Sequence, residues 1–72
     1  MKYAILLEPQ IEGGFTVTVP ELPGCVCEGE TAAECRANIT EAIEGWIETA
    51  KANGWSVPPP RMLFDQVEVL AS

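Results

Sequence analysis

One long segment has the periodicity of an amphipathic helix, and this segment limits the fold more than any other feature. Its apolar residues follow the i, i+4, i+7, i+8, i+11 spacing of a single buried stripe. They are Cys35, Ile39, Ala42, Ile43, Trp46, Ile47 and Ala50. Thr31 and Glu34 form a capping box at its start, and Asn53-Gly54 supplies the stop. A helix from Ala32 to Ala52 would be about 30 Å long, enough to cover one face of a small sheet.

Two segments before this helix have the pattern of β-strands. Lys2–Glu8 is rich in β-branched and aliphatic residues, and Phe15–Val19 alternates apolar and polar residues with period two. The paired glycines Gly13-Gly14 between them can take the positive φ that closes a hairpin. We therefore expect an antiparallel pair whose second strand directs its apolar residues to the core and its threonines to the other face, as in a sheet covered on one face.

The remaining elements follow from prolines and short apolar runs. Pro23-Gly24 predicts a turn, and Cys25–Glu28 a short third strand. Trp55–Pro60 ends in three prolines and is expected to be an extended linker that returns the chain to the sheet. Val67–Leu70 alternates as a last strand would. The predicted fold is α+β, of order β-β-β-α-β, with an antiparallel sheet covered on one face by one long helix.

Length and charge restrict the partners. The chain has 72 residues, so we expect one domain over residues 1–72, and its small core together with open strand edges favours a homo-oligomer, a dimer or higher. Its net charge of −7 would repel nucleic acid and attract a basic protein. No signal sequence and no run of about 20 apolar residues is present, so a cytoplasmic protein without a membrane partner is expected.

The chain has no histidine, which removes the commonest general base, and we do not expect an enzyme. Its cysteines are Cys25, Cys27 and Cys35, an odd number that favours reduced thiols. A nucleophilic Cys25 would lack a base, and the three thiolates would lack a fourth zinc ligand. Packing in the core is the preferred interpretation, so no catalytic residue, metal or cofactor is predicted.

The carboxylates of the helix are more informative. Glu34, Glu41, Glu44 and Glu48 fall within an arc of roughly 80° at about 100° per residue, opposite Ile39. This acidic face is either a solvated surface or a surface for a basic partner. Trp55 follows the helix stop and either folds back on the core or anchors an interface. The candidate partner-binding residues are thus Glu41, Glu44, Glu48 and Trp55.

The run Glu12–Cys25, which reads EGGFTVTVPELPGC, resembles the signature of the HicB antitoxin family. The resemblance continues through Glu28–Thr31, with Glu34 at the acidic position of the T-x-x-E start, and through Asn38–Ile43 to the proline cluster Pro58–Pro60. It covers about three quarters of the chain in consecutive order, which makes it far more specific than a single short motif.

The resemblance implies a partial ribonuclease H-like fold and an antitoxin that blocks a small basic HicA-type endoribonuclease toxin. Many family members continue into a DNA-binding segment. We expect no such C-terminal domain here, and no direct nucleic-acid binding by this chain alone. Ribonuclease H chemistry needs acidic residues on the first strand and elsewhere, and only Glu8 stands at the end of this first strand. The alternatives are a stand-alone oligomeric interaction module and a carboxylate-dependent nuclease remnant.

Overall fold

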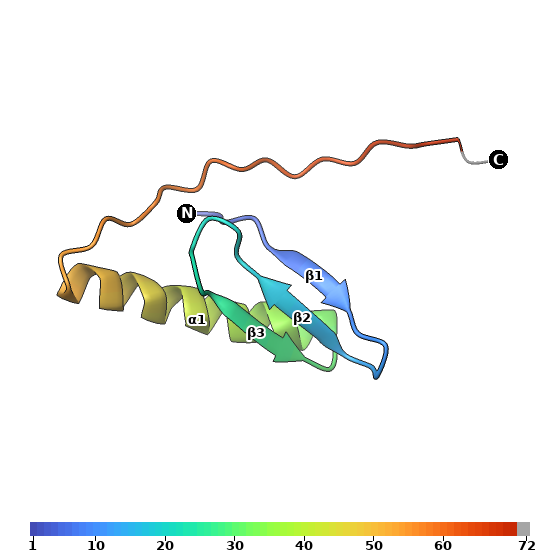
Figure 1. The fold of residues 1–72 in the computed structure, drawn as a ribbon, viewed down its shortest axis with the longest axis horizontal. Helices are drawn as coiled ribbons and strands as arrows, with labels where there is room; N and C mark the ends of the chain where they lie inside the picture. The colour runs from blue at the N-terminus through green and yellow to red at the C-terminus, as the bar shows by residue number, and fades with distance from the viewer. Residues whose placement is uncertain (71–72) are drawn as a thin grey trace.

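A computed structural model describes residues 1–70 and has three short antiparallel strands packed on one long helix (Figure 1). The strands are β1 (Leu6–Pro9), β2 (Phe15–Thr18) and β3 (Val26–Gly29), in the sheet order β1-β2-β3, and the helix is α1 (Ala32–Ala52). The predicted α+β architecture, with three antiparallel strands followed by one long covering helix, is confirmed.

The first hairpin forms as the sequence predicts. Gly13 and Gly14 have φ values of +101° and +76°, and the Gln10 N–H donates to the Gly14 carbonyl over 3.0 Å. Positive φ is favourable only for residues without a Cβ, so the two glycines set the turn and with it the register. In that register Val17 pairs with Leu7 on one side and with Cys27 on the other.

The first strand is shorter than the expected Lys2–Glu8. The ladder between β1 and β2 starts where Leu6 pairs with Thr18, and Pro20 follows two residues later. A proline has no N–H for the ladder, and the chain here turns into the β2–β3 loop, so residues 2–5 extend beyond the end of the sheet. At the other end β1 includes Pro9, which an edge strand tolerates.

Local signals set both ends of α1. The Thr31 hydroxyl accepts from the Glu34 N–H over 3.1 Å, as an N-cap residue does. At the other end Gly54 has a φ of +69°, and the Trp55 N–H donates to the Ala50 carbonyl over 2.8 Å. This is the bond pattern of a Schellman motif, and it ends the helix at the predicted residue.

The core lies between α1 and the face of the sheet formed by β2 and β3. Its buried residues come from both layers and are Val17, Val19, Leu22, Cys25, Cys35 and Ile39. Phe15 and Trp46 are half-buried and pack against this cluster, as predicted for both. The Trp46 Nε1 also donates to the Pro23 carbonyl over 3.0 Å and so fastens the β2–β3 loop to the helix.

The expectation of a last strand over Val67–Leu70 is wrong in this structure. Residues 55–70 have no regular secondary structure, and every residue of the C-terminal arm, which we define as residues 61–70, is exposed (Figure 1). An alternating pattern becomes a strand only when it finds an edge to pair with. The chain instead leaves the sheet at Arg61 and Met62, whose N–H groups donate to the Glu21 carboxylate over 2.8 and 3.3 Å.

Candidate functional site

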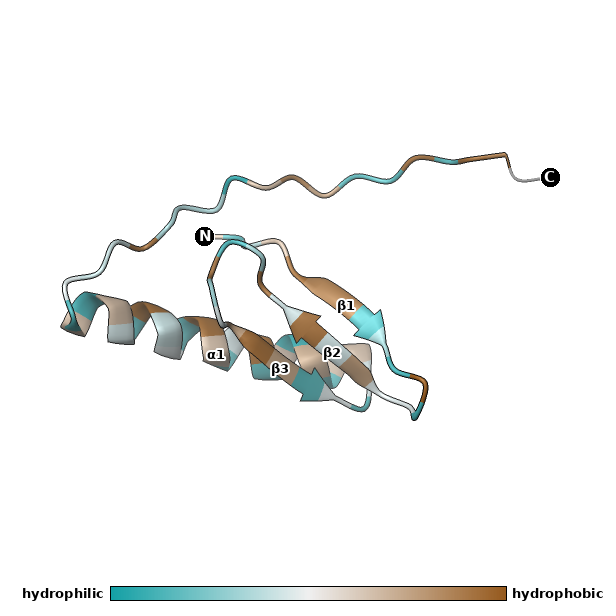
Figure 2. Ribbon diagram, in the orientation of Figure 1, coloured by the Kyte–Doolittle hydropathy of each residue, from teal (hydrophilic) through white to brown (hydrophobic). Residues whose placement is uncertain are grey.

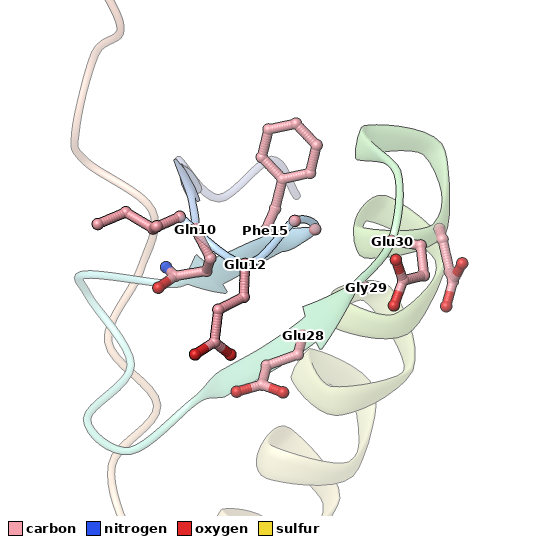
Figure 3. A pocket seen from close by; sticks show the side chains of 10 residues that line it. Gln10, Glu12, Phe15, Glu28, Gly29 and Glu30 are labelled. Atoms are coloured by element: carbon pink, nitrogen blue, oxygen red, sulfur yellow. The ribbon is translucent and has the colours of Figure 1, made fainter.

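An acidic hollow of about 580 Å³ lies where the β1–β2 turn meets the end of β3 and the start of α1. The four carboxylate residues in its lining are Glu12, Glu28, Glu30 and Glu34. The glycine pair of the turn and Phe15 complete much of the remaining wall. Figure 3 shows Glu12 and Glu28 extending to the same side of the hollow, whereas Glu30 lies on the wall toward the helix.

Two glycines allow the walls of the acidic hollow to approach one another. A Cβ on Gly14 would lie 2.9 Å from the Gly29 carbonyl oxygen, and a Cβ on Gly29 would lie 2.9 Å from Cys35 Sγ. The turn therefore contacts the end of β3, and the end of β3 contacts the first turn of α1. A bond from Asn38 Nδ2 to the Glu28 carbonyl, 3.0 Å long, holds β3 to the helix beside the hollow.

The acidic hollow continues into the acidic face of α1. Glu34 lines the hollow and also stands at the start of the helix face, on which Glu41, Glu44 and Glu48 are all exposed. These seven carboxylates, four in the hollow and three further along the helix, are called the acidic band below. Glu44 and Glu48 are spaced i, i+4, and like charges at this spacing cost a few tenths of a kcal/mol in a helix.

The sequence predicted only part of this site. The helix carboxylates Glu41, Glu44 and Glu48 are exposed on one element, but the hollow was not foreseen because Glu12 and Glu28 are distant in sequence. The signal that could have found it is the pair of glycine-containing acidic runs, Glu12–Gly14 and Glu28–Glu30, since close backbone contact at glycine brings such runs together.

Trp55 lies apart from the acidic hollow. It follows the C-terminal end of α1, whereas Glu34 lies in the first turn, and the helix between them spans about 30 Å. Its side chain is 58% exposed, so it does not fold back into the core. The structure therefore does not bring Trp55 and the hollow into one site.

The thiols contribute to packing. Burial raises the pKa of Cys35, and the neighbouring Glu34 and Cys27 raise it further; burial and then Cys27 raise the pKa of Cys25. Both thiols are thus protonated at neutral pH. Cys35 Sγ donates to the Phe15 carbonyl over 3.8 Å. Within residues 1–70 the cysteines form no disulfide, and no three His, Cys, Asp or Glu side chains are arranged to hold a metal ion.

Within the same residues, α1 lacks the apolar length that a membrane span requires.

Comparison with known proteins places this fold in a family. Residues 3–70 match the family model described as HicB_like antitoxin of bacterial toxin-antitoxin system. A UPF0150 protein of Thermoplasma acidophilum is 40% identical over 58 residues, covering 81% of this chain and 84% of that protein. Antitoxin HicB 1 of Photorhabdus laumondii is 30% identical over 60 residues, covering 83% of this chain and 39% of the longer relative.

The solved structures include a similar fold. A chain of the HicA3 and HicB3 toxin-antitoxin complex superposes with a TM-score of 0.72 at 33% identity, covering 86% of this chain and 72% of that chain. The chain belongs to the HicB-like antitoxin family.

Proposed function

We propose that this protein binds a small basic endoribonuclease toxin of the HicA type and inhibits it, with the acidic band as the surface that attracts and orients the toxin. The family membership supports the antitoxin role, and the structurally similar chain comes from a complex of a HicA toxin with a HicB antitoxin. The observation that carries the proposal is the acidic band, four carboxylates in the hollow and three exposed ones further along α1, in a chain of net charge −7.

Charge of this kind acts first on the encounter between the two proteins. A toxin that binds RNA needs a positive surface, and an antitoxin with a complementary negative surface competes directly with the RNA phosphates for it. The repulsion between Glu44 and Glu48 is relieved when a cation lies between them. Rim charges of an interface change the association rate and its salt dependence more than the dissociation rate.

Trp55 is the proposed second contact. It is the exposed aromatic residue at the end of α1 away from the acidic hollow, and tryptophan is enriched among the residues that dominate interface energies. With both ends of the helix engaged, the toxin would lie along α1. We infer that no catalytic group of this chain takes part: inhibition comes from occupying the surface of the toxin.

Association kinetics test the acidic band. The triple variant E41Q/E44Q/E48Q should associate with the cognate toxin on the order of tenfold more slowly at low salt, with a flatter salt dependence and an unchanged dissociation rate. The control E8Q/D65N/E68Q makes the same change in net charge outside the band and should associate more nearly like the wild type. Equal slowing by both variants would assign the effect to net charge alone and remove the band from the interface.

A stand-alone oligomeric module is the second candidate function. The observation that favours it is the exposed apolar C-terminal arm, because a monomer rarely leaves so many large apolar side chains uncovered. Self-association does not exclude toxin binding, and the two are separated by whether a purified oligomer still protects RNA from the toxin.

A further inference from the structure

The C-terminal arm is the largest apolar feature that the fold leaves uncovered. Six of its side chains are large and apolar, and each is at least 51% exposed: Met62, Leu63, Phe64, Val67, Val69 and Leu70. Figure 2 shows the apolar stretches along the arm as it runs out past the sheet. The radius of gyration, 14.3 Å, exceeds the roughly 11 Å expected for a compact chain of this length. In the monomer these side chains stay exposed to water and contribute no burial of apolar surface to stability.

A second hollow on the same molecule has matching chemistry. This apolar groove, of about 460 Å³, lies between the N-terminal segment and α1. Tyr3 and Ile5 line one wall, and Ile39, Ile43 and Ile47 line the other. The groove is open because α1 packs against β2 and β3, while β1 is the edge strand of the sheet. The apolar residues of α1 on the β1 side are therefore left uncovered by the sheet, and the groove lies between them and the N-terminal segment.

We propose that the C-terminal arm of one copy docks in extended form in the apolar groove of a second copy, and that the second copy returns the same contact. The assembly is an arm-exchanged dimer with two-fold symmetry, in which each contact is made twice. The proposal does not depend on the toxin, because both surfaces belong to this chain.

Length and charge fit this occupant. The groove runs along α1 from Arg36 to Ile47, about 17 Å, which five or six extended residues of the arm would span. The arm carries Arg61, Asp65 and Glu68, while Arg36 and Glu44 line the groove and Lys2 lies between two lining residues. An arm with two carboxylates and one cation therefore meets a groove where two cations stand against one carboxylate, in a chain whose net charge is −7. This local complementarity offsets the repulsion between two copies.

The base of the arm favours a second copy over the arm's own groove. Tyr3 lines the groove, and its hydroxyl donates to the Pro58 carbonyl over 2.6 Å, so the linker passes the rim of the groove. Residues 58–60 are all proline and hold an extended, semi-rigid course. The Glu21 carboxylate then binds the N–H groups of Arg61 and Met62. The arm is thereby directed away from its own groove, and stiff hinges of this kind favour exchange between copies.

Isotope-resolved cross-linking tests the exchange. Full-length chains with natural nitrogen and with nitrogen-15 are unfolded and refolded together in equal amounts, and a carbodiimide then joins the amines of Lys2 or Met1 to Asp65 or Glu68. Mass spectrometry should find about half of the cross-linked peptide pairs with mixed isotopes, as random pairing of two copies requires. Pairs confined to single-isotope chains would show that each arm docks on its own groove, and the absence of such cross-links would equally overturn the proposal.

Sedimentation of full-length variants gives an independent test. The wild type should be a dimer at micromolar concentration, and V67D/V69D should weaken the dimer by at least on the order of tenfold while the helical signal of the circular dichroism spectrum is unchanged. The control for an added carboxylate is I11D, which places one charge on a fully exposed apolar residue of the β1–β2 turn and should leave the dimer intact. A monomeric wild type, or a dimer that both variants retain equally, would contradict arm exchange.

Discussion

Gly29 shows how the absence of a side chain allows two elements of the fold to pack closely. A Cβ there would lie 2.9 Å from Cys35 Sγ and 3.1 Å from the Cys35 nitrogen, so an added methyl group would have to displace the buried thiol or the helix backbone. The close contact of β3 with the first turn of α1, which forms one wall of the acidic hollow, therefore depends on this glycine.

Gly29→Ala should lower the free energy of unfolding by about 1–3 kcal/mol, because an extra methyl group in a packed contact forces its neighbours apart. Gly45→Ala is the matched control: a Cβ at this exposed helix position has no neighbour within 4 Å, and alanine there should raise the stability by up to about 1 kcal/mol. Urea unfolding followed by tryptophan fluorescence measures both. Equal effects of the two substitutions would contradict the close contact.

Cys35 also gives the fold a pH dependence. Its pKa is raised by burial above the ordinary value of 9.0, so the folded state holds the thiol proton more tightly than the unfolded state does. The resulting stability is fully present below pH 9 and is lost as the pH rises through the folded pKa. Stability of the wild type should fall above pH 9 in the presence of a reductant, and Cys35→Ala should show a shallower fall. If the stability of the wild type and that of Cys35→Ala fell with the same slope above pH 9, Cys35 would not be the source of the pH dependence.

The helix boundaries were predictable because short-range signals set them. A threonine cap, a glutamate three residues later and a glycine stop fix the ends without help from the rest of the fold. The strands were less predictable, since a strand ends where its partner ends. Residues 2–5 have a strand-like sequence, but the ladder stops at the pairing of Leu6 with Thr18.

The cap at the start of α1 can be tested directly. Thr31→Ala should cost about 1 kcal/mol of stability, because the Glu34 N–H loses its acceptor. Thr40→Ala is the matched control, since Thr40 is exposed in the helix interior and its hydroxyl bonds back to the Arg36 carbonyl. This second change should alter stability by less than about 0.5 kcal/mol. Thermal unfolding of both variants would reveal whether the cap has this role.

The overall arrangement of the protein combines an acidic band, an apolar groove and an apolar arm in 72 residues. The family resemblance predicted the antitoxin class, and the helix pattern predicted four of the seven carboxylates of the acidic band. The hollow escaped prediction because it needs two distant runs in contact. The course of the arm escaped it because Val67–Leu70 has the pattern of a strand, whereas the hydrogen bonds from Arg61 and Met62 to Glu21 direct the chain away from the sheet.

Protection of RNA from a HicA-type toxin of the same organism tests the central proposal most directly. The full-length protein is titrated into a cleavage assay containing the purified toxin and a labelled RNA, with a control lacking toxin to detect nuclease activity of the chain itself. Inhibition by occupancy predicts that cleavage stops near a one-to-one ratio with the wild type, whereas E41Q/E44Q/E48Q, which associates more slowly at low salt, needs a larger excess there. Undiminished cleavage at a large excess of the wild-type protein would contradict the antitoxin function.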